Sequence, residues 1–243
     1  LRGVGTRGVP EIPVGSSFSN TYSMAFDGVD QSIDLGITNS GANDVSVSCW
    51  IKTTETHTIS EKRCAFGGRN NGSGTNYGIG TLGSAFGSAD DMKVRIFNTF
   101  GSTKINDGDW HNIIYTHNYT TKETKAYVDG NTTPEITTTI PAWSTFFRIF
   151  IGWNGFDTGF YFDGNIDECS YYTSVLGTSD VTTIYNSGVP GDLTSLSPVG
   201  WWRMGDNASW DGSNWTLTDQ GSGGNDGTSD NSVEADRKSD VPS

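Results

Sequence analysis

The stretch Asp107-Gly108-Asp109-Trp110-His111-Asn112-Ile113-Ile114-Tyr115 decides the fold together with a second stretch, Lys125-Ala126-Tyr127-Val128-Asp129-Gly130-Asn131. The first is a polar turn that leads into an apolar strand, and the second is a strand that runs into an Asp-Gly-Asn turn. Because Asp-Gly beside apolar strands is a strong hairpin signal, the two stretches predict an antiparallel β-hairpin. We expect the Trp of the first stretch to open one strand and the Asp-Gly of the second to close its partner.

The composition extends this prediction to the whole chain, whose 243 residues are enough for one large β-sandwich or two small domains. Gly, Ser, Thr, Asn and Asp dominate, which is typical of many short strands joined by tight turns. Aromatic residues make up 12% of the chain and supply the bulk of a sandwich core.

The formal net charge of −13 bears on the partners that the chain can have. An acidic surface repels phosphate backbones and anionic lipid, so nucleic acid is disfavoured as a partner. No apolar run is long enough to span a bilayer, and we expect no membrane insertion. Simple solubility explains the same acidity equally well.

Alternating apolar residues predict the strands, most clearly over 45–52. This segment places Val45, Val47, Cys49 and Ile51 on one face and Trp50 on the other, which indicates that both faces are covered. Further strands are expected at 22–26, 32–35, 64–66, 77–79, 93–97, 112–119, 124–129, 149–152, 160–164, 165–172 and 201–204. The tryptophans expected in the core are Trp50, Trp110, Trp201 and Trp202.

One short helix is expected after these strands. Thr178-Ser179-Asp180 offers N-cap oxygens, apolar residues follow at helical spacing up to Tyr185, and Gly188-Val189-Pro190 ends the segment. Many short strands and one helical turn predict an all-β, antiparallel sandwich.

Changes in composition divide the chain into three parts. Residues 1–17 are rich in Gly and lack apolar periodicity, so we expect an extended N-terminal arm. Residues 18–190 form the sandwich. Residues 191–243 form a C-terminal extension whose first strand, at about 200–204, adds to the same sandwich. The acidic, Gly-rich tail is expected to be irregular beyond Gly227.

The three cysteines do not form a disulfide scaffold, because their number is odd and their spacing irregular. Cys49 and Cys169 lie in apolar strand patterns, where a free thiol behaves as a small hydrophobe. Cys64 lies in a polar stretch, and the sequence leaves open whether one pair is oxidised.

The order of several motifs resembles the laminin-G-like branch of the concanavalin A-like lectins and glucanases over roughly residues 19–188. The motifs are Phe26-Asp27-Gly28-Val29-Asp30, Val47-Ser48-Cys49-Trp50-Ile51-Lys52, Trp110-His111, Tyr127-Val128-Asp129-Gly130, Phe162-Asp163-Gly164-Asn165-Ile166-Asp167-Glu168, and Leu176-Gly177-Thr178 to Tyr185. The resemblance implies a concanavalin A-like jelly roll with one short helix, in a branch that holds many sugar-binding and adhesion modules and few enzymes.

The C-terminal segment adds a second resemblance. Gly200-Trp201-Trp202-Arg203-Met204-Gly205-Asp206 and residues 217–228 look like the first strand and Gly-Asn loop of such a domain, moved to the end of the chain. This ending is similar to structural proteins of tailed phages, especially marine ones. It implies a virion surface protein, as capsid decoration or as a tail or fibre component, that is extracellular and contacts other virion proteins, copies of itself and cell-surface glycans. A secreted bacterial carbohydrate-binding or adhesion module is the alternative, and a divergent glycan hydrolase or lyase is a second one.

Catalysis is not expected. Enzyme relatives carry a Glu-x-Asp-x-x-Glu pattern, in which alternation points the acid and the nucleophile into one cleft. Here Asp167 and Glu168 are adjacent, so we expect their side chains to point to opposite faces and not to act as a pair on one sugar. His57, His111 and His117 have neither metal spacing nor a nucleophile motif beside them.

Glycan binding is expected at a turn that combines two rings, an amide and an acid, namely Trp153, Asn154, Phe156 and Asp157, with Trp143 nearby in sequence. Rings stack on the apolar face of a pyranose while polar groups bind its hydroxyls. The competing interpretation is that these rings are core or inter-subunit contacts.

Calcium is the one cofactor expected, because the related fold often holds it with Asp side chains and loop carbonyls. The resemblance places Asp27 and Asp167 on neighbouring motifs, and Asp30 could join them. Alternatively, these carboxylates cap turns by accepting hydrogen bonds from local N–H groups.

Overall fold

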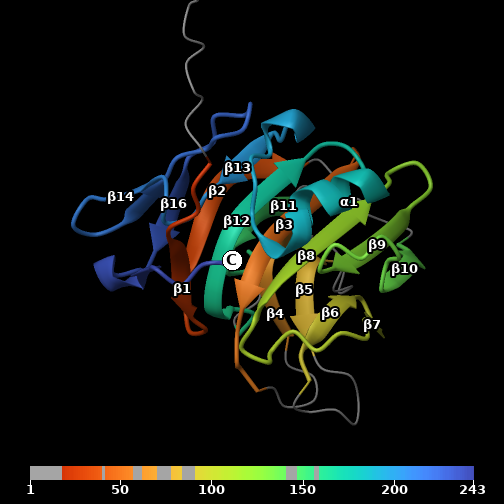
Figure 1. Ribbon diagram of the computed structural model, residues 1–243, viewed down its shortest axis with the longest axis horizontal. Coiled ribbons are helices and arrows are strands. Elements are labelled where there is room, and N and C mark those ends of the chain that lie inside the picture. The colour runs from red at the N-terminus through yellow and green to blue at the C-terminus, as the bar shows by residue number, and fades with distance from the viewer. Residues whose placement is uncertain are drawn as a thin grey trace, which may run out of the picture.

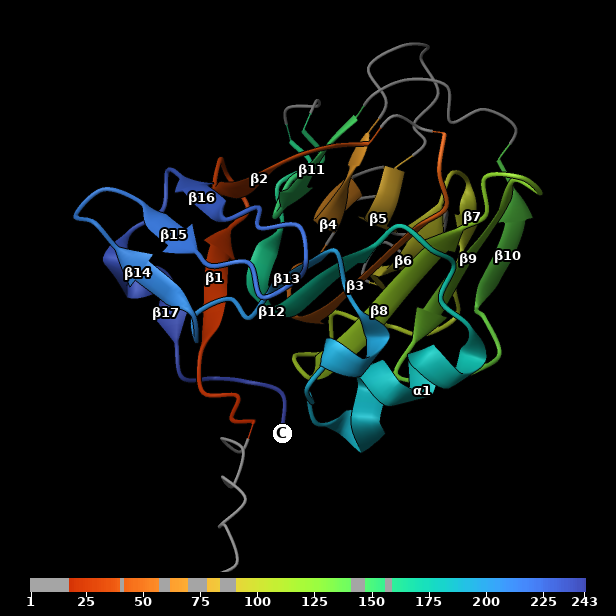
Figure 2. The same ribbon diagram turned by 90° about the horizontal axis from the view of Figure 1, so that it is seen from above.

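Two antiparallel β-sheets face each other in the computed structural model, and a short helix covers the outer side of one of them (Figures 1 and 2). The structure describes residues 18–39, 42–56, 62–69, 78–83, 91–140, 147–155 and 159–243. The predicted all-β sandwich with one short helix is confirmed, whereas the N-terminal arm at 1–17 lies outside the described residues.

Sheet A has strands from both halves of the chain. In spatial order they are β10 (Ile136–Thr139), β9 (Glu123–Val128), β8 (Trp110–His117), β3 (Val45–Lys52), β12 (Asp163–Tyr172), β1 (Ser23–Asp27) and β17 (Arg237–Lys238). A further strand, β13 (Gly200–Trp202), pairs with β12. Because β1 pairs with 163–166 and β13 with 169–171, the two flank the same edge of β12 one after the other.

Sheet B lies behind it in Figure 1. Its order is β14 (Ala208–Trp210), β15 (Trp215–Leu217), β16 (Gly227–Asp230), β2 (Ser32–Asn39), β11 (Phe147–Ile151), β4 (Lys62–Arg69), β5 (Gly78–Gly83), β6 (Lys93–Ile96) and β7 (Thr99–Phe100). The helices are α1 (Thr178–Tyr185) and three short 3-10 turns at Asn186–Gly188, Thr194–Leu196 and Glu234–Asp236.

The core between the sheets follows the alternation of the strands. Val45, Val47, Cys49 and Ile51 of β3 all lie in it, as their spacing predicts. Rings and aliphatic chains from both sheets fill the rest, and each fully buried Leu, Ile or Phe contributes about 1.5–3 kcal/mol. The three cysteines are free and buried, so Cys64 packs in the interior although the residues just before it are polar.

A second apolar layer covers the outer face of sheet A. Trp50 stacks on Tyr185 of α1, with ring centroids 5.6 Å apart. Val181 and Ile184 of the same helix are buried against this face. Figure 2 shows α1 on the side of sheet A that faces away from sheet B. Of the four tryptophans expected in the core, Trp110 is partly exposed, because it lies on this outer face beyond the reach of the helix.

The predicted hairpin is formed by β8 and β9, whose register pairs Ile113 with Val128. Asp129 has a positive φ of 50° and accepts a hydrogen bond from the Asn112 backbone N–H at 2.9 Å. Gly130 follows at a φ of +69°, and a Cβ there would collide with the ring of Tyr185. The Asp-Gly turn is therefore needed both for its backbone conformation and for the close approach of α1.

The C-terminal segment completes both sheets. β13 and β17 join sheet A, while β14, β15 and β16 extend sheet B. The expectation that the tail is irregular beyond Gly227 is wrong, because β16 pairs with β2 and β17 pairs with β1. The expected strand at 160–164 is also wrong at its start: β12 begins only at Asp163. Neither difference is visible in local patterns, since the pairing partners are distant in sequence.

Candidate functional site

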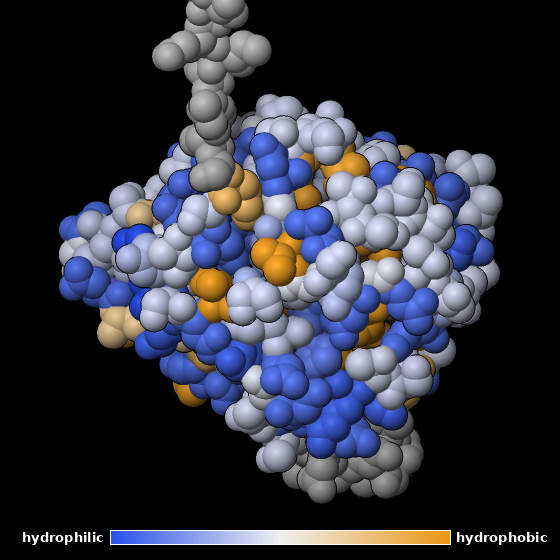
Figure 3. Space-filling model, in the orientation of Figure 1, coloured by the Kyte–Doolittle hydropathy of each residue, from blue (hydrophilic) through white to orange (hydrophobic). Residues whose placement is uncertain are grey.

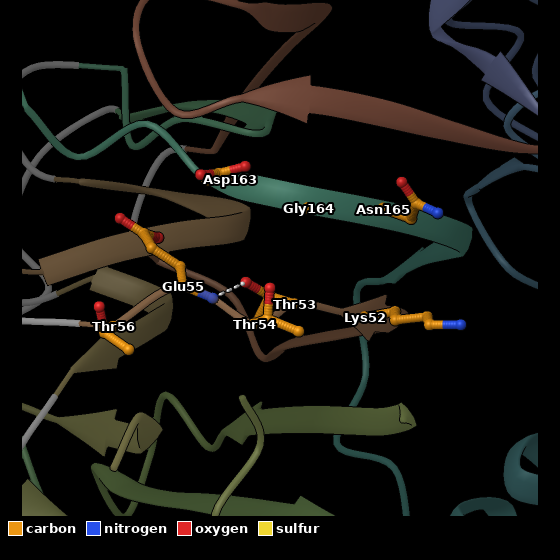
Figure 4. Close-up of a pocket in the computed structure, with 8 residues that line it drawn as sticks. All are labelled: Lys52, Thr53, Thr54, Glu55, Thr56, Asp163, Gly164 and Asn165. Atoms are coloured by element: carbon orange, nitrogen blue, oxygen red, sulfur yellow. Dashed lines mark hydrogen bonds between the residues drawn. The ribbon is translucent and has the colours of Figure 1, made fainter. Parts of the chain in front are cut away.

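A polar pocket opens at the end of sheet A where β3 and β12 separate (Figure 4). Lys52 pairs with Asn165 at the end of the shared register, and beyond them the two chains diverge around a cavity of about 480 Å³. Residues 52–56 line one side and residues 163–165 the other. Hydroxyls, carboxylates, an amide and an ammonium group therefore surround one opening.

Close backbone packing shapes this opening. Gly164 has a φ of +138°, and a Cβ there would collide with the Lys52 carbonyl oxygen. Only glycine allows β12 to start this close to the end of β3. In Figure 4 the side chains of Lys52 and Asn165 extend to one side, away from those of Glu55 and Asp163.

Side-chain contacts hold the loop that follows β3. Glu55 N–H donates to Thr53 Oγ1 at 3.0 Å, and Asn106 Nδ2 donates to the Glu55 carbonyl at 2.8 Å. Arg63 Nε donates to Glu55 Oε1 at 2.8 Å, and Arg63 Nη1 reaches the Gly159 carbonyl at 3.0 Å. This loop is thereby joined to β4 and to the approach to β12, so the wall of the pocket is preorganised.

An aromatic stack lies on the same approach to β12. Trp153 packs face to face on Tyr161, with centroids 5.4 Å apart and ring planes 8° from parallel, and edge-on to Phe150. Both rings of the stack are partly exposed. Burial, then the charges of Asp30 and Asp230, raise the pKa of Tyr161. A part-exposed ring pair close to acidic groups thus lies just before β12 in the chain and packs on Phe150 of sheet B.

The predicted glycan residues fall partly on this stack. Trp153 is one of its two rings, and Asn154 is buried with 4% of its surface exposed. Phe156, Asp157 and Trp143 lie outside the described residues. The pocket residues 52–56 and 163–165 were missed, although polar Thr-Thr-Glu-Thr after one apolar strand and Asp-Gly-Asn before another are signals that the sequence offers.

The predicted calcium ligands do not assemble into one site. Strand register places Asp163, and not Asp167, opposite Asp27. Asp167 lies four residues further along β12, roughly 13 Å away at the usual strand rise. Asp27 Oδ1 instead accepts a hydrogen bond from the Val29 N–H at 2.9 Å, as in the turn-capping alternative.

Asp30 is exposed in the same turn, and its carbonyl oxygen accepts a hydrogen bond from Asn231 Nδ2 at 3.3 Å. Within the described ranges, no group of three His, Cys, Asp or Glu side chains is placed to hold a metal ion. The three carboxylates therefore do not fit the calcium site expected of them, and calcium binding by this chain stays a prediction.

The two adjacent acids lie on the same face of sheet A, and the expectation of opposite faces is wrong. A β-bulge interrupts the pairing of β12 with β3 between Asp167 and Ser170, and Glu168 has a positive φ of 45°. Ile166 before the bulge and Cys169 after it both point into the core, so Asp167 and Glu168 both point outward.

Each oxygen of this acid pair already accepts a hydrogen bond. Asn20 Nδ2 donates to Asp167 Oδ2 at 2.9 Å, and the Glu168 N–H donates to Oδ1. Trp201 Nε1 donates to Glu168 Oε2 at 2.6 Å, and Arg203 Nε donates to Oε1 at 2.9 Å. Asp167 and Glu168 are 0% and 3% exposed, so neither reaches a ligand in this arrangement.

Burial dominates the ionisation of this pair. Burial raises the pKa of Glu168 to about 7, against the opposing effects of Arg203 and Trp201. Burial, and then the neighbouring Glu168 carboxylate, raise the pKa of Asp167 well above its usual range. Burial at this site therefore favours the protonated form of both carboxyl groups.

The two described histidines have structural partners. Burial alone would lower the pKa of His111, but hydrogen bonds and charges from Asp129 and Asp107 outweigh it and raise that pKa to about 9. His111 thus joins both ends of the hairpin, at 2.7 Å from Asp129 and 3.1 Å from Asp107. His117 is buried beside Thr124 at 2.7 Å, and burial lowers its pKa to about 4.

The chain belongs to the concanavalin A-like lectin/glucanases superfamily, whose laminin-G family pattern matches residues 27–182. The family that the sequence motifs predicted is thus confirmed. A comparison with curated protein sequences gives no match. Among the described residues, no helix is both long and apolar enough to cross a lipid bilayer.

Solved structures show the same fold at low sequence identity. A candidate carbohydrate-binding protein from Bacteroides ovatus is 16% identical with a TM-score of 0.64, and the match covers 93% of this chain. This chain spans 62% of that protein. A heptameric SAP-like pentraxin from Limulus polyphemus is 12% identical with a TM-score of 0.52, over 68% of this chain and 82% of that one. The first match, over 93% of the chain, includes most of the C-terminal segment in the shared fold.

Proposed function

We propose that this protein is a non-enzymatic glycan-binding protein that uses the polar pocket between β3 and β12 and the Trp153–Tyr161 stack. The observation that carries the proposal is the combination of a preorganised polar opening of about 480 Å³ with part-exposed stacked rings on a lectin-like fold. Rings bind the apolar face of a sugar, and hydroxyl, carboxylate and amide groups bind its hydroxyls. Hydrophilic residues also dominate the face that carries α1, where apolar residues form only separate patches (Figure 3).

The state of the acids supports a binding role over a hydrolytic one. Glycoside hydrolysis needs two carboxyl groups that flank a bound sugar. The Asp167–Glu168 pair is buried and fully hydrogen-bonded, and the pocket carboxylate of Glu55 is held by Arg63. Asp163, the other pocket acid, lies opposite Asp27, whose carboxylate caps its own turn by accepting a hydrogen bond from the Val29 N–H.

A glycan array followed by calorimetry tests the binding site. Trp153→Ala is expected to weaken binding of the best glycan by about tenfold, a typical effect for a stacking ring. Trp210→Ala is the matched control, because Trp210 also is part-exposed and packs on another ring, Trp215, but lies at the far edge of sheet B. Equal losses in the two variants, or no binding to any glycan, would contradict the proposal.

An activity screen on algal and bacterial polysaccharides tests the absence of catalysis. We expect no turnover from the wild-type chain. Turnover that is abolished by Asp167→Asn, or by Glu55→Gln, would instead identify a divergent hydrolase or lyase.

For its biological setting, we propose a homo-oligomeric component of a virion surface. The proposal is supported by the similarity of the C-terminal segment to structural proteins of tailed phages and by the net charge of −13, which disfavours nucleic acid as a partner. The same site would serve a secreted bacterial adhesion module, which is the alternative. A cryo-electron map of particles that contain the chain distinguishes the two, and light scattering gives the oligomeric state.

A further inference from the structure

The carboxylate of Asp240 lies among three donors that come from three neighbouring strands. Lys52 of β3 approaches it with Nζ 3.1 Å from Oδ1 and 2.9 Å from Oδ2. Trp110 of β8 donates from Nε1 at 3.0 Å, and Asn165 of β12 donates from Nδ2 at a longer 3.5 Å. One ammonium, one indole and one amide group therefore converge on a single carboxylate.

The strand register by itself places these three donors side by side. Lys52 pairs with Trp110 on one side and with Asn165 on the other, so all three side chains point to the outer face of sheet A. The donors therefore stand in one row across the sheet. The sheet fixes the backbone positions of this row, so only the side chains need to be ordered around a carboxylate.

The carboxylate itself comes from the end of the chain. After β17 the tail crosses the outer face of sheet A near β1 and β12, as the position of the C-terminus shows (Figure 1). Ser23 Oγ donates to the Asp240 carbonyl at 2.6 Å, which holds the backbone in place. Burial raises the pKa of Asp240, but the hydrogen bonds from Lys52 and Trp110 outweigh it and lower that pKa.

We propose that Lys52, Trp110 and Asn165 form a subsite for the carboxylate of an acidic sugar, such as a uronate, and that Asp240 occupies this subsite as an internal competitor in the free protein. The inference rests on the proposed function, because Lys52 and Asn165 also line the pocket between β3 and β12. The pocket next to the subsite would take the hydroxyls of the same sugar or of its neighbour in the chain.

Displacement of Asp240 by a ligand is energetically accessible. The side chains of Lys52 and Asp240 are 32% and 46% exposed, and ion pairs this exposed contribute little to stability. The Asp240 side chain can rotate away while Ser23 holds its backbone. A neutral sugar cannot replace the negative charge beside Lys52, so the subsite distinguishes acidic from neutral glycans.

Calorimetry with an oligogalacturonate and with its fully methyl-esterified form tests this inference on the full chain. Asp240→Asn is expected to tighten binding of the acid form by about fivefold, the factor that ~1 kcal/mol represents, and to leave the ester unchanged. Asp91→Asn is the matched control, because it adds the same charge and breaks a similarly exposed pair, with Lys104 at 3.3 Å. The double variant Lys52→Gln with Asp240→Asn is expected to lose the gain.

Two outcomes overturn the inference. Asp240→Asn and Asp91→Asn could tighten binding equally, which would indicate only a general charge effect. Acid and ester could instead bind alike in every variant. A chain that binds other, neutral glycans in a Trp153-dependent way but shows either outcome keeps the proposed function and loses the acidic subsite, whereas a chain that binds no glycan loses both.

Discussion

The two carboxylate sites along β12 differ in their exposure to solvent. Asp163, at the start of the strand, is exposed at the mouth of the pocket. Asp167 and Glu168, only a few residues later, are buried between the start of β1 and the end of β13. The difference teaches that the neighbours of a strand, more than its own residues, decide whether an acid can bind a ligand or only supports the fold.

The buried site connects the segment before β1 to the segment that follows β13. Besides its bond to Glu168, Arg203 donates to Asp206, and Asp206 accepts from the Thr21 N–H at 3.0 Å. Glu168 and Asp206 thus share the cation of Arg203, while Asp167 accepts a hydrogen bond from Asn20, and these contacts hold residues 20–21 against 203–206. Changes here should alter stability, whereas changes at the pocket should alter binding.

Removing the shared cation gives the largest expected effect on stability. Arg203→Met leaves Glu168 buried without its partner, which costs about 3–5 kcal/mol in such pairs. Urea unfolding at pH 8 measures the loss, and it should be smaller at pH 5, where Glu168 can take up a proton instead. Lys104→Met, which breaks only the exposed pair with Asp91, should cost under about 1 kcal/mol. Similar losses in both variants would remove the distinction between the sites.

The pH dependence of stability sharpens the same comparison. The folded pKa of Glu168 is about 7, above its ordinary 4.5, so folding favours the protonated form. This contribution is complete below pH 4.5, is lost as the pH rises to 7, and amounts to about 3 kcal/mol at most. Glu168→Gln should therefore flatten the fall in the free energy of unfolding over this window.

His117 makes stability depend on pH in the opposite direction. Burial lowers its pKa to about 4, so the stability that its neutral form contributes is lost as the pH falls from 6.5 to 4. The difference between wild type and Glu168→Gln isolates the carboxyl group, since both chains contain His117. A variant whose pH profile parallels that of the wild type would show that Glu168 titrates normally.

The hairpin and the outer layer over β3 could be predicted from the sequence because their signals are local. The Asp129-Gly130 turn and the alternation around Trp50 each specify geometry within a few residues. Tyr185, which covers Trp50, was correctly placed on the one helix, although its contact is distant in sequence. Local periodicity is thus sufficient to predict the buried face of an element where its own residues decide that face.

The pocket and the direction of Glu168 could not be predicted, because pairing between distant segments creates both. Lys52 and Asn165 meet only through the register of β3 with β12. The bulge at Glu168 lies in the pairing of β12 with β3, at the point where β13 replaces β1 on the other edge of β12. The strand β16 was missed for the same reason: its Gly-Thr-Ser-Asp sequence has little apolar signal and needs β2 as its template.

His111 at the hairpin should have a moderate effect on stability, because here two carboxylates hold a cation. The pKa of His111 is raised to about 9, so its ion pairs contribute fully to stability below pH 6.5 and are lost as the pH rises to 9. Since the side chains of Asp107 and Asp129 are 41% and 31% exposed, solvent screening limits the contribution to about 1 kcal/mol. His111→Gln should lose this amount at pH 6 and almost nothing at pH 9.5 in urea unfolding. An imidazole resonance that titrates near pH 6.5 would contradict the assignment.

A substitution at the pocket should give the smallest change in stability. Lys52→Gln removes an exposed ion pair with Asp240, so the free energy of unfolding should fall by less than about 1 kcal/mol, and salt should erase the difference. Urea unfolding at low and high ionic strength measures it, with Arg203→Met as the contrasting variant. A loss comparable to that of Arg203→Met would mean that the pocket cation supports the fold as the buried one does, and the separation of binding from stability along β12 would not hold.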